Sequence, residues 1–575
     1  MRNSSVVSAF GILLIVCTAC SSAQPPASPA SGPREQSSTP AAPKVLRVAI
    51  LAEPPGFLMS ITGSSTTTGG AQQPTEIVHN WLTFTDANSE PQPSLALELP
   101  ALDKGTWRVN ADGTMETTWK LRPNIKWHDG VAFTADDIVF GWEVLRDPAI
   151  PSARSAQARL ITAIETPDPA TLVMKWQQVW VDANDMGRGT IEPLPRHLIG
   201  ETYERNKENF INNAYWSVEF VGVGPFKLVD WVQGSHMDFA RFDAYYRVPA
   251  RIDRLFLQFI SDPNTQVSAL LSEDIDVLLP IGVDMEGARL VQERWANTRN
   301  QVLIAIPQRL RFLSHQGRAD DQKQPALLDP AVRRALYQGI DRPQLGEFVL
   351  LGLGEVADSF VPPNHGYRRE VEASIPSYPY SQADASRALA DMGWTRGGDG
   401  SLRNAAGAPL SFQFWATLNA RSGKEMPIIA DGWRQLGMQV EERLQPAAIV
   451  RDPETWHRFP GMEIIAQLAT SFWKDRIDSR EMAGPQNRWN GSNFGGYSNA
   501  VVDQLLDRLS VTIPRAERVA LTRQLVNETM TDVAVMPLYW DPDPLFGLAK
   551  VKNLPPPSAI TQVHTWNVNE WDIVP

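Results

Sequence analysis

The sequence predicts an α/β fold, because segments with strand character alternate with segments that carry helix start signals. Residues 45–52 (VLRVAILA) are almost continuously apolar, as expected for a strand buried on both faces. Thr134 precedes Asp136 and Asp137, a pattern typical of an N-cap followed by acids that the helix dipole favours. Roughly 530 residues follow residue 44, which indicates two or three lobes rather than one core.

Further elements follow the same alternation. A short strand is expected at residues 117–121, before a turn at 128–130 (HDG). Phe133 and Ile138 fit a hydrophobic staple around the helix that starts after Thr134. Four more helices are predicted from their capping residues, at Asp329, Asp341, Ser381 and Ser498.

The N-terminus has the pattern of a secretion signal. Arg2 precedes an apolar run, residues 6–16, that is too short to span about 30 Å of hydrocarbon. Thr18-Ala19-Cys20 resembles a bacterial lipobox, which implies a signal peptide over residues 1–19 and lipidation of Cys20; an ordinary cleaved signal peptide is the alternative. Cleavage would remove Cys17, the other cysteine of the chain, and lipidation would consume the thiol of Cys20. No thiol would then be left for a disulfide or a metal site.

The segment after Cys20 is expected to be a disordered tether. Residues 21–44 are rich in Pro, Ser and Ala, and they contain no aromatic residue and no Ile, Leu, Val or Met. Such a segment cannot bury enough apolar surface to offset its conformational entropy. Residues 20–44 therefore read as a lipidated cysteine and a linker that holds a globular body away from a membrane.

Composition and motifs argue against several functions. The net charge of −12 disfavours nucleic acid as a partner. The chain has no G-x-S-x-G elbow, no P-loop and no complete G-x-G-x-x-G, and its eight histidines lack zinc-site spacing. His128-Asp129 suggests a general base, but the following Gly130 favours a turn. A carboxylate pair of the glycosidase type leaves too little trace in sequence to be assessed this way.

Seven motifs together resemble one protein family. Residues 119–143 (WKLRPNIKWHDGVAFTADDIVFGWE) resemble the signature of dipeptide/oligopeptide-type solute-binding proteins of ABC transporters. Six further matches follow in the family's order: GVGPFKL, SALLSEDIDVL, LDPAVRRALYQGIDR, ASRALADMGW, GGYSNAVVDQLLD and AVMPLYW. Within the first motif, Arg122 and Asp137 are expected to have structural roles.

The resemblance implies a two-lobed, hinged binding-protein fold of type II, with mixed sheets flanked by helices and an extra inserted domain. Chain order places lobe I at residues 45–72, 215–306 and 538–575, the inserted domain at 73–214, and lobe II at 307–537. It implies a monomeric, extracytoplasmic lipoprotein that closes on a peptide or related small polar solute and docks on ABC permease and ATPase subunits. The alternatives are a secreted hydrolase that uses the same cleft, and a binding or signalling lipoprotein without a transporter.

The ligand is less well defined than the family. Peptide-binding relatives use an acidic side chain within a W-x-A-D-Y-x-D-P stretch, which residues 465–482 do not match, so chelates, haem, oligosaccharides and opines stay open. We expect no cofactor, no metal and no catalytic residue. The resemblance, with the polar loop at 60–70 and the aromatic pair at 472–473, suggests these ligand-binding candidates: Glu53, Ser65, Thr66, Phe472, Trp473, Asp475, Asp478, Trp489 and Asn490.

Overall fold

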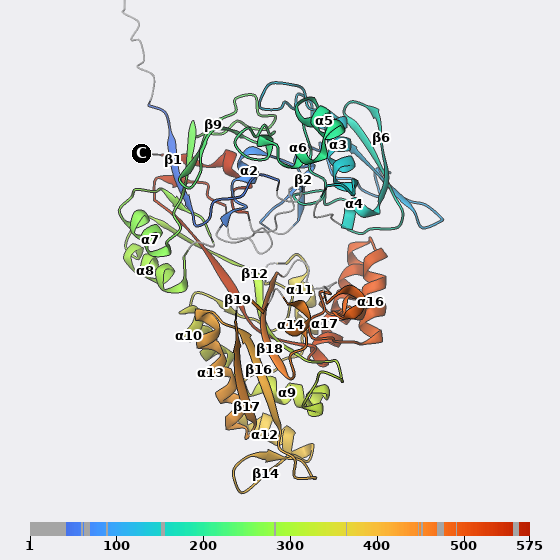
Figure 1. Ribbon diagram of the computed structural model, residues 1–575, viewed down its shortest axis with the longest axis vertical. Coiled ribbons are helices and arrows are strands. Elements are labelled where there is room, and N and C mark those ends of the chain that lie inside the picture. Colours follow the sequence, from blue (N-terminus) through green and yellow to red (C-terminus); the bar gives the residue numbers. More distant parts are fainter. Residues whose placement is uncertain are drawn as a thin grey trace, which may run out of the picture. The chain divides into compact units, whose positions relative to one another are not determined.

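Two long strands organise the largest sheet of the protein and connect two sets of shorter strands (Figure 1). The computed structural model describes residues 42–58, 61, 70–87, 90–150, 156–280, 283–363, 365–446, 448–449, 452–468, 476–489, 491–555 and 563–574. The predicted signal peptide, Cys20 and almost all of the predicted tether lie outside these ranges. Residues 43–575 form one compact unit.

The long strands are β12 (Gln301–His315) and β19 (Val535–Gly547), which pair antiparallel along most of their length. We call the strands beyond β12 the C-terminal set and the strands beyond β19 the N-terminal set. The C-terminal set comprises β17 (Gln439–Gln445), β16 (Ser411–Thr417) and β18 (Met462–Leu468). The N-terminal set comprises β11 (Val277–Leu278), β1 (Val45–Ile50), β10 (Arg254–Phe259), β9 (His236–Arg241) and β8 (Phe226–Val232).

A separate four-stranded antiparallel sheet lies in the chain between β1 and β8. Its order is β4 (Trp107–Val109), β5 (Met115–Lys120), β7 (Thr171–Trp176) and β6 (Ile161–Asp168). Strand β5 corresponds to the strand predicted at residues 117–121. Three two-stranded ribbons complete the sheets: β2 (Thr83–Thr85) with β3 (Pro91–Pro93), β14 (Thr395–Arg396) with β15 (Leu402–Arg403), and β20 (Val551–Lys552) with β21 (Asp572–Ile573). Strand β13 (Glu355–Val356) pairs with β19.

The helices begin close to the capping residues that predicted them. The longer ones are α3 (Ala135–Arg146), α5 (Arg196–Arg205), α7 (Pro263–Leu271), α8 (Met285–Trp295), α9 (Pro330–Gln338), α10 (Arg342–Leu350), α12 (Gln382–Asp391), α13 (Ala420–Gln435), α16 (Ala500–Val511) and α17 (Arg515–Thr531). Asp329, Asp341 and Ser381 each accept a hydrogen bond from a main-chain N–H in the first turn. The cap predicted at Ser498 is wrong by one residue, because the Asn499 side chain accepts from Val501 N instead.

Two hydrophobic cores accompany the two strand sets. The first collects the C-terminal set and the helices from α7 to α17, with Trp433 and Trp540 fully buried at its centre. The second collects the N-terminal set, the four-stranded sheet and α3, and it buries Trp119, Trp127 and Trp176. Much of the tryptophan content that the sequence displays therefore serves packing.

The first family-like motif folds as a scaffold around a turn. Gly130 has a φ of +92°, and Val131 N donates to Asp129 Oδ1 at 3.0 Å, as the turn prediction requires. His128 is fixed by Gly222 N, which donates to Nδ1, and by Gly224 O, which accepts from Nε2, both at 3.1 Å. These contacts make His128 a neutral structural histidine and use two glycines of the GVGPFKL segment.

The predicted structural roles of Arg122 and Asp137 are confirmed. Arg122 Nε donates to Ser94 O at 2.8 Å, and the Asp137 carboxylate accepts from Thr134 N at 2.9 Å and from Trp127 Nε1 at 3.2 Å. Among the described residues, none of the helices is long and apolar enough to cross a bilayer.

Candidate functional site

The topology brings the carboxyl ends of both strand sets toward one place. Strands β16, β17 and β18 run parallel and end at Thr417, Gln445 and Leu468, whereas β1, β10 and β11 run parallel in the other set. Leu468 lies opposite Arg309, which lies opposite Asp541, and Leu278 at the end of β11 lies opposite Phe546. The two carboxyl edges therefore face each other across a short stretch of β19.

We call this stretch the junction: residues 305–309 of β12 and 541–545 of β19. Ligands of open α/β sheets bind outside the carboxyl ends of the strands, so the junction is the place where the fold itself predicts binding. The pairing of β12 with β19 is irregular here, because the register shifts between Ala305 and Arg309. Pro542 and Pro544 have no N–H to donate, which further reduces the ladder hydrogen bonds of β19.

A row of charged side chains approaches the junction along one face of the two strands. Alternation places Tyr539, Asp541 and Asp543 on the same face of β19. At the inner end of the row, Arg311 Nη2 lies 2.5 Å from Glu425 Oε2, and the Tyr539 hydroxyl also donates to Glu425. Both charged side chains are buried, so Arg311, Glu425 and Tyr539 form a rigid support for the row and not a site that a solute could reach.

The middle of the row is an ion pair with one end open to solvent. Helix α13 starts after the N-cap Asn419, whose side chain accepts from Ser422 N at 2.9 Å, and its first turn carries Arg421. Arg421 pairs with Asp541; the arginine side chain is 34% exposed and the aspartate side chain 8%. The outer member of the row, Asp543, is partly buried and lies opposite Ala305.

Asp543 is the acid of the row for which the described residues provide no partner. It has no hydrogen bond or ion pair with any residue in the part of the chain that the structure describes. Burial and the neighbouring charge of Asp541 raise its pKa to about 6, and the attraction of Arg309 and Arg421 opposes this rise. A carboxylate held in this way at a binding edge is a candidate recognition group.

Three of the residues predicted from the sequence are described, and all three have protein contacts. Glu53 follows β1 and accepts from Trp231 Nε1 at 2.7 Å and from Gly234 N at 2.8 Å. Asp478 pairs with Arg480 at 2.8 Å and caps a short 3-10 helix. Trp489 is partly buried at a left-handed φ of +62°, and the guanidinium groups of Arg318 and Arg458 lie 5.7 and 5.8 Å from its ring centroid.

The other predicted site residues lie outside the described residues: Ser65, Thr66, Phe472, Trp473, Asp475 and Asn490. Residues 469–475 come directly after β18 in the chain, and residues 62–69 come after β1. Their roles stay predictions. The sequence reading missed Asp541, Asp543, Arg309 and Arg421. The available signal was a pair of acids two residues apart within an otherwise apolar strand, VMPLYWDPDPLFG.

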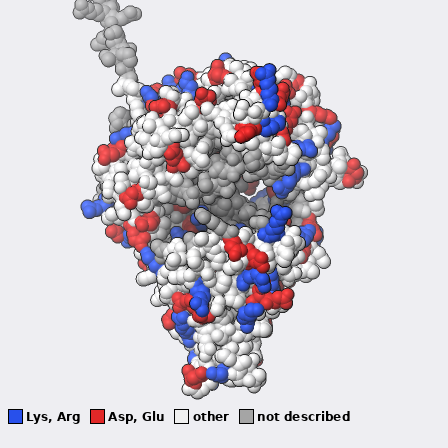
Figure 2. Space-filling model, in the orientation of Figure 1, with Lys and Arg blue, Asp and Glu red and all other residues white. Residues whose placement is uncertain are grey.

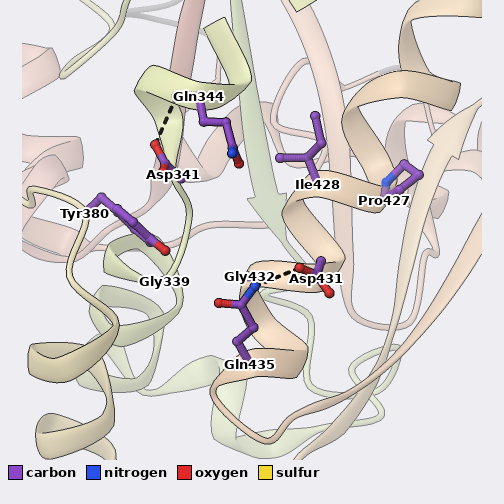
Figure 3. Close-up of a pocket in the computed structure, with 9 residues that line it drawn as sticks. All are labelled: Gly339, Asp341, Gln344, Tyr380, Pro427, Ile428, Asp431, Gly432 and Gln435. Carbon is purple, nitrogen blue, oxygen red and sulfur yellow. Dashed lines mark hydrogen bonds between the residues drawn. The ribbon is translucent and has the colours of Figure 1, made fainter. Parts of the chain in front are cut away.

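Two hollows elsewhere in the described structure are less suitable. One has a volume of about 270 Å³ between α10 and α13, and Figure 3 shows that its carboxylates are engaged. Gln344 N donates to Asp341 at 2.9 Å, and Gln435 Nε2 donates to Asp431 at 2.7 Å. The other, of about 470 Å³, is lined by loop residues near Arg247 and Asn567. Neither hollow is lined by residues of the junction. Figure 2 shows acidic and basic residues interspersed over the face in view.

Comparison with known proteins gives the family. Residues 98–498, well over half of the chain, match the model of the bacterial extracellular solute-binding proteins, family 5 middle region. The oligopeptide-binding protein AppA of Bacillus subtilis is 24% identical over 99% of this chain and 97% of its own length. The glutathione-binding protein GsiB of Shigella boydii is 24% identical over 82% of this chain and 83% of its own length.

Solved structures share the fold. AppA from Bacillus subtilis, solved with a nonapeptide, superposes with a TM-score of 0.66 at 20% identity, over 93% of this chain and all of AppA. NikZ from Campylobacter jejuni, solved with Ni(L-His), superposes with a TM-score of 0.67 at 22% identity, over 92% of this chain and all of NikZ. The predicted two-lobed α/β fold is confirmed, and the chain belongs to the family 5 bacterial extracellular solute-binding proteins.

Proposed function

We propose that this chain captures a peptide or a related small polar solute at the junction and delivers it to an ABC importer. The single observation that carries the proposal is the meeting of two carboxyl strand edges across β12 and β19, with Arg421, Asp541 and Asp543 at that place. The names of AppA and GsiB point to peptides, whereas NikZ was solved with a nickel chelate of an amino acid. A solute with both positive and negative groups would suit the mixed charges of the row.

Capture would work by closing the two strand sets around the solute. The junction is the connection that would bend, because its register is irregular and two prolines remove ladder donors. Only the closed state would let the solute contact loops that follow β1 and loops that follow β18. Shifting such an equilibrium from 1:99 to 99:1 requires about 5.5 kcal/mol of differential affinity, which a multi-contact site can supply.

The proposal extends to the parts of the chain outside the described residues. Cys20 would carry the lipid anchor, residues 20–44 would act as the tether, and the body would work as a monomer on the outer side of the cytoplasmic membrane. The domain limits are proposed as lobe I at 45–72, 215–306 and 538–575, the insertion at 73–214, and lobe II at 307–537. In this role the solute is bound and released without breaking its bonds.

Native mass spectrometry of the purified chain tests the proposal most simply, combined with thermal shift against peptide and sugar panels. A solute present at 100 times its dissociation constant should stabilise the protein by about 2.7 kcal/mol. The bound solute should be recovered unchanged after prolonged incubation. Recovery of a cleaved product would support a hydrolase instead. Binding of sugars alone would exclude peptides as the captured solute.

A further inference from the structure

The acids along the charged row differ in how the protein compensates them. Glu425 accepts from Arg311 and Tyr539, and Asp541 pairs with Arg421. Asp543 lies next along the same face of β19, yet none of the described residues bonds to it. Within the described part of the chain, the row therefore ends with one carboxylate that has no counter-ion at contact distance.

An unpaired, partly buried carboxylate is unfavourable for the protein on its own. Partial burial reduces the hydration of the carboxylate, and no hydrogen bond from the described residues replaces what is lost. The charged groups that influence Asp543 are Asp541 on its own strand, Arg309 on β12 and Arg421 on α13, and Arg421 is already paired with Asp541. The raised pKa of Asp543 reports the same energetic cost. A positively charged partner from outside the chain would offset this energetic cost.

The position of Asp543 indicates where that partner comes from. It lies between Asp541, opposite Arg309 at the end of β18, and Phe546, opposite Leu278 at the end of β11. A group bound there would touch the connection between the two strand sets, where the proposed capture occurs.

We infer that Asp543 binds a positively charged group of the captured solute, an ammonium or a guanidinium. The inference rests on the proposed function and narrows it to solutes that carry a cationic group. A single carboxylate with one acidic neighbour, already paired to arginine, does not provide the ligand set of a metal site, whereas it suits a monovalent cation that donates hydrogen bonds. The paired Arg421 and Asp541 would screen the remainder of the row and leave Asp543 as the recognition group.

The test compares two variants with the unmodified full chain. Asp543→Asn removes the charge with little change of shape, and Asp103→Asn makes the same charge change at an exposed residue distant from the junction in sequence. The first probe is a mixture of pentapeptides of Ala, Gly, Ser and Leu with free amino termini, paired with its N-acetylated counterpart. The second probe is a panel of arginine, putrescine and glucosamine against glucose and citrate. Binding is read by native mass spectrometry and titration calorimetry.

We expect the wild-type chain and Asp103→Asn to retain at least one amine-bearing probe. Acetylation, or the change Asp543→Asn, should weaken that binding by about 30-fold or more, since one partner of a buried charge pair is lost. Without any probe, Asp543→Asn should unfold at the same temperature as the wild type or higher, because an unpaired charge has been removed. This melting measurement separates loss of recognition from loss of folding.

Three results overturn the inference and leave the proposed function standing. The first is equal binding of the free and acetylated peptides, and the second is equal binding by Asp543→Asn and wild type. The third is retention of glucose or citrate alone. If the wild-type chain retains none of the probes, the proposed function itself fails.

Discussion

Removing Arg311 should destabilise the protein strongly, because it leaves a buried carboxylate without its main counter-ion. Arg311 Nε lies 3.1 Å from both Glu425 oxygens and Nη2 lies 2.5 Å from one of them, and the side chains are 8% and 0% exposed. In Arg311→Met, the hydrogen bond from Tyr539 is the one that the described residues still donate to Glu425. Breaking a buried pair in this way costs about 3–5 kcal/mol. For a protein of this size, the urea midpoint should fall by roughly 1 M.

Urea denaturation followed by tryptophan fluorescence measures this loss. The double variant Arg311→Met with Glu425→Gln should recover at least half of it, because no unpaired charge is left. Arg254→Met is the matched control; it removes an arginine from a solvent-exposed pair with Asp238 and should cost at most about 1 kcal/mol. Equal urea midpoints for Arg311→Met and Arg254→Met, or a double variant no more stable than the single one, would contradict this prediction.

Three further predictions follow from the described contacts. In Gly222→Ala the new Cβ would lie 2.0 Å from a main-chain oxygen, so the soluble yield should collapse, whereas Gly398→Ala, which has open space, should express normally. Burial lowers the pKa of His128 to about 4, so the unfolded state binds the proton more tightly; stability should fall by up to about 2 kcal/mol between pH 7 and pH 5. His128→Gln should lose that part of the pH dependence in urea titrations at the two pH values. Arg518 on α17, a helix of the first core, pairs at 3.1 Å with Asp182, which adjoins a residue of the second core. A pair that connects the two cores would help to hold them together around a solute. Arg518→Glu should therefore weaken solute affinity, by about fivefold or less, while the melting temperature stays unchanged. A clear loss of stability would contradict this role of the pair.

Local signals allowed much of the fold to be predicted. The helices after Asp329, Asp341 and Ser381 start where predicted, because capping is decided by side chains within one turn. The glycines of GVGPFKL could be matched to a family, but the reason why glycine is needed there is a tertiary contact. Gly222 passes so close to the main chain of Val78 that no side chain fits. Sequence alone does not show that contact.

The candidate site was harder to predict for the same reason. Asp541 and Arg309 are far apart in the chain and meet only through the register of β12 and β19. Helix α13 adds Arg421 from a third segment. The prediction instead followed loops after strand ends, such as Glu53 and Asp478, whose carboxylates the structure finds in hydrogen bonds with the protein. Acids embedded in an apolar strand deserve more weight than acids in loops, because burial makes their charge costly.

In the proposed mechanism, two halves of the protein close around a solute by bending at the junction. Cys17 and Cys20 are the two cysteines of the chain, so both can be replaced by Ser. One spin label is then attached to a cysteine introduced at Glu204 on α5, and a second to a cysteine introduced at Gln504 on α16. Both positions are exposed, and their helices belong to different cores. Pulsed electron spin resonance between these labels measures the distance with and without the solute identified by native mass spectrometry. The account predicts a shorter and narrower distance distribution when solute is bound. Identical distributions in the two states would contradict it.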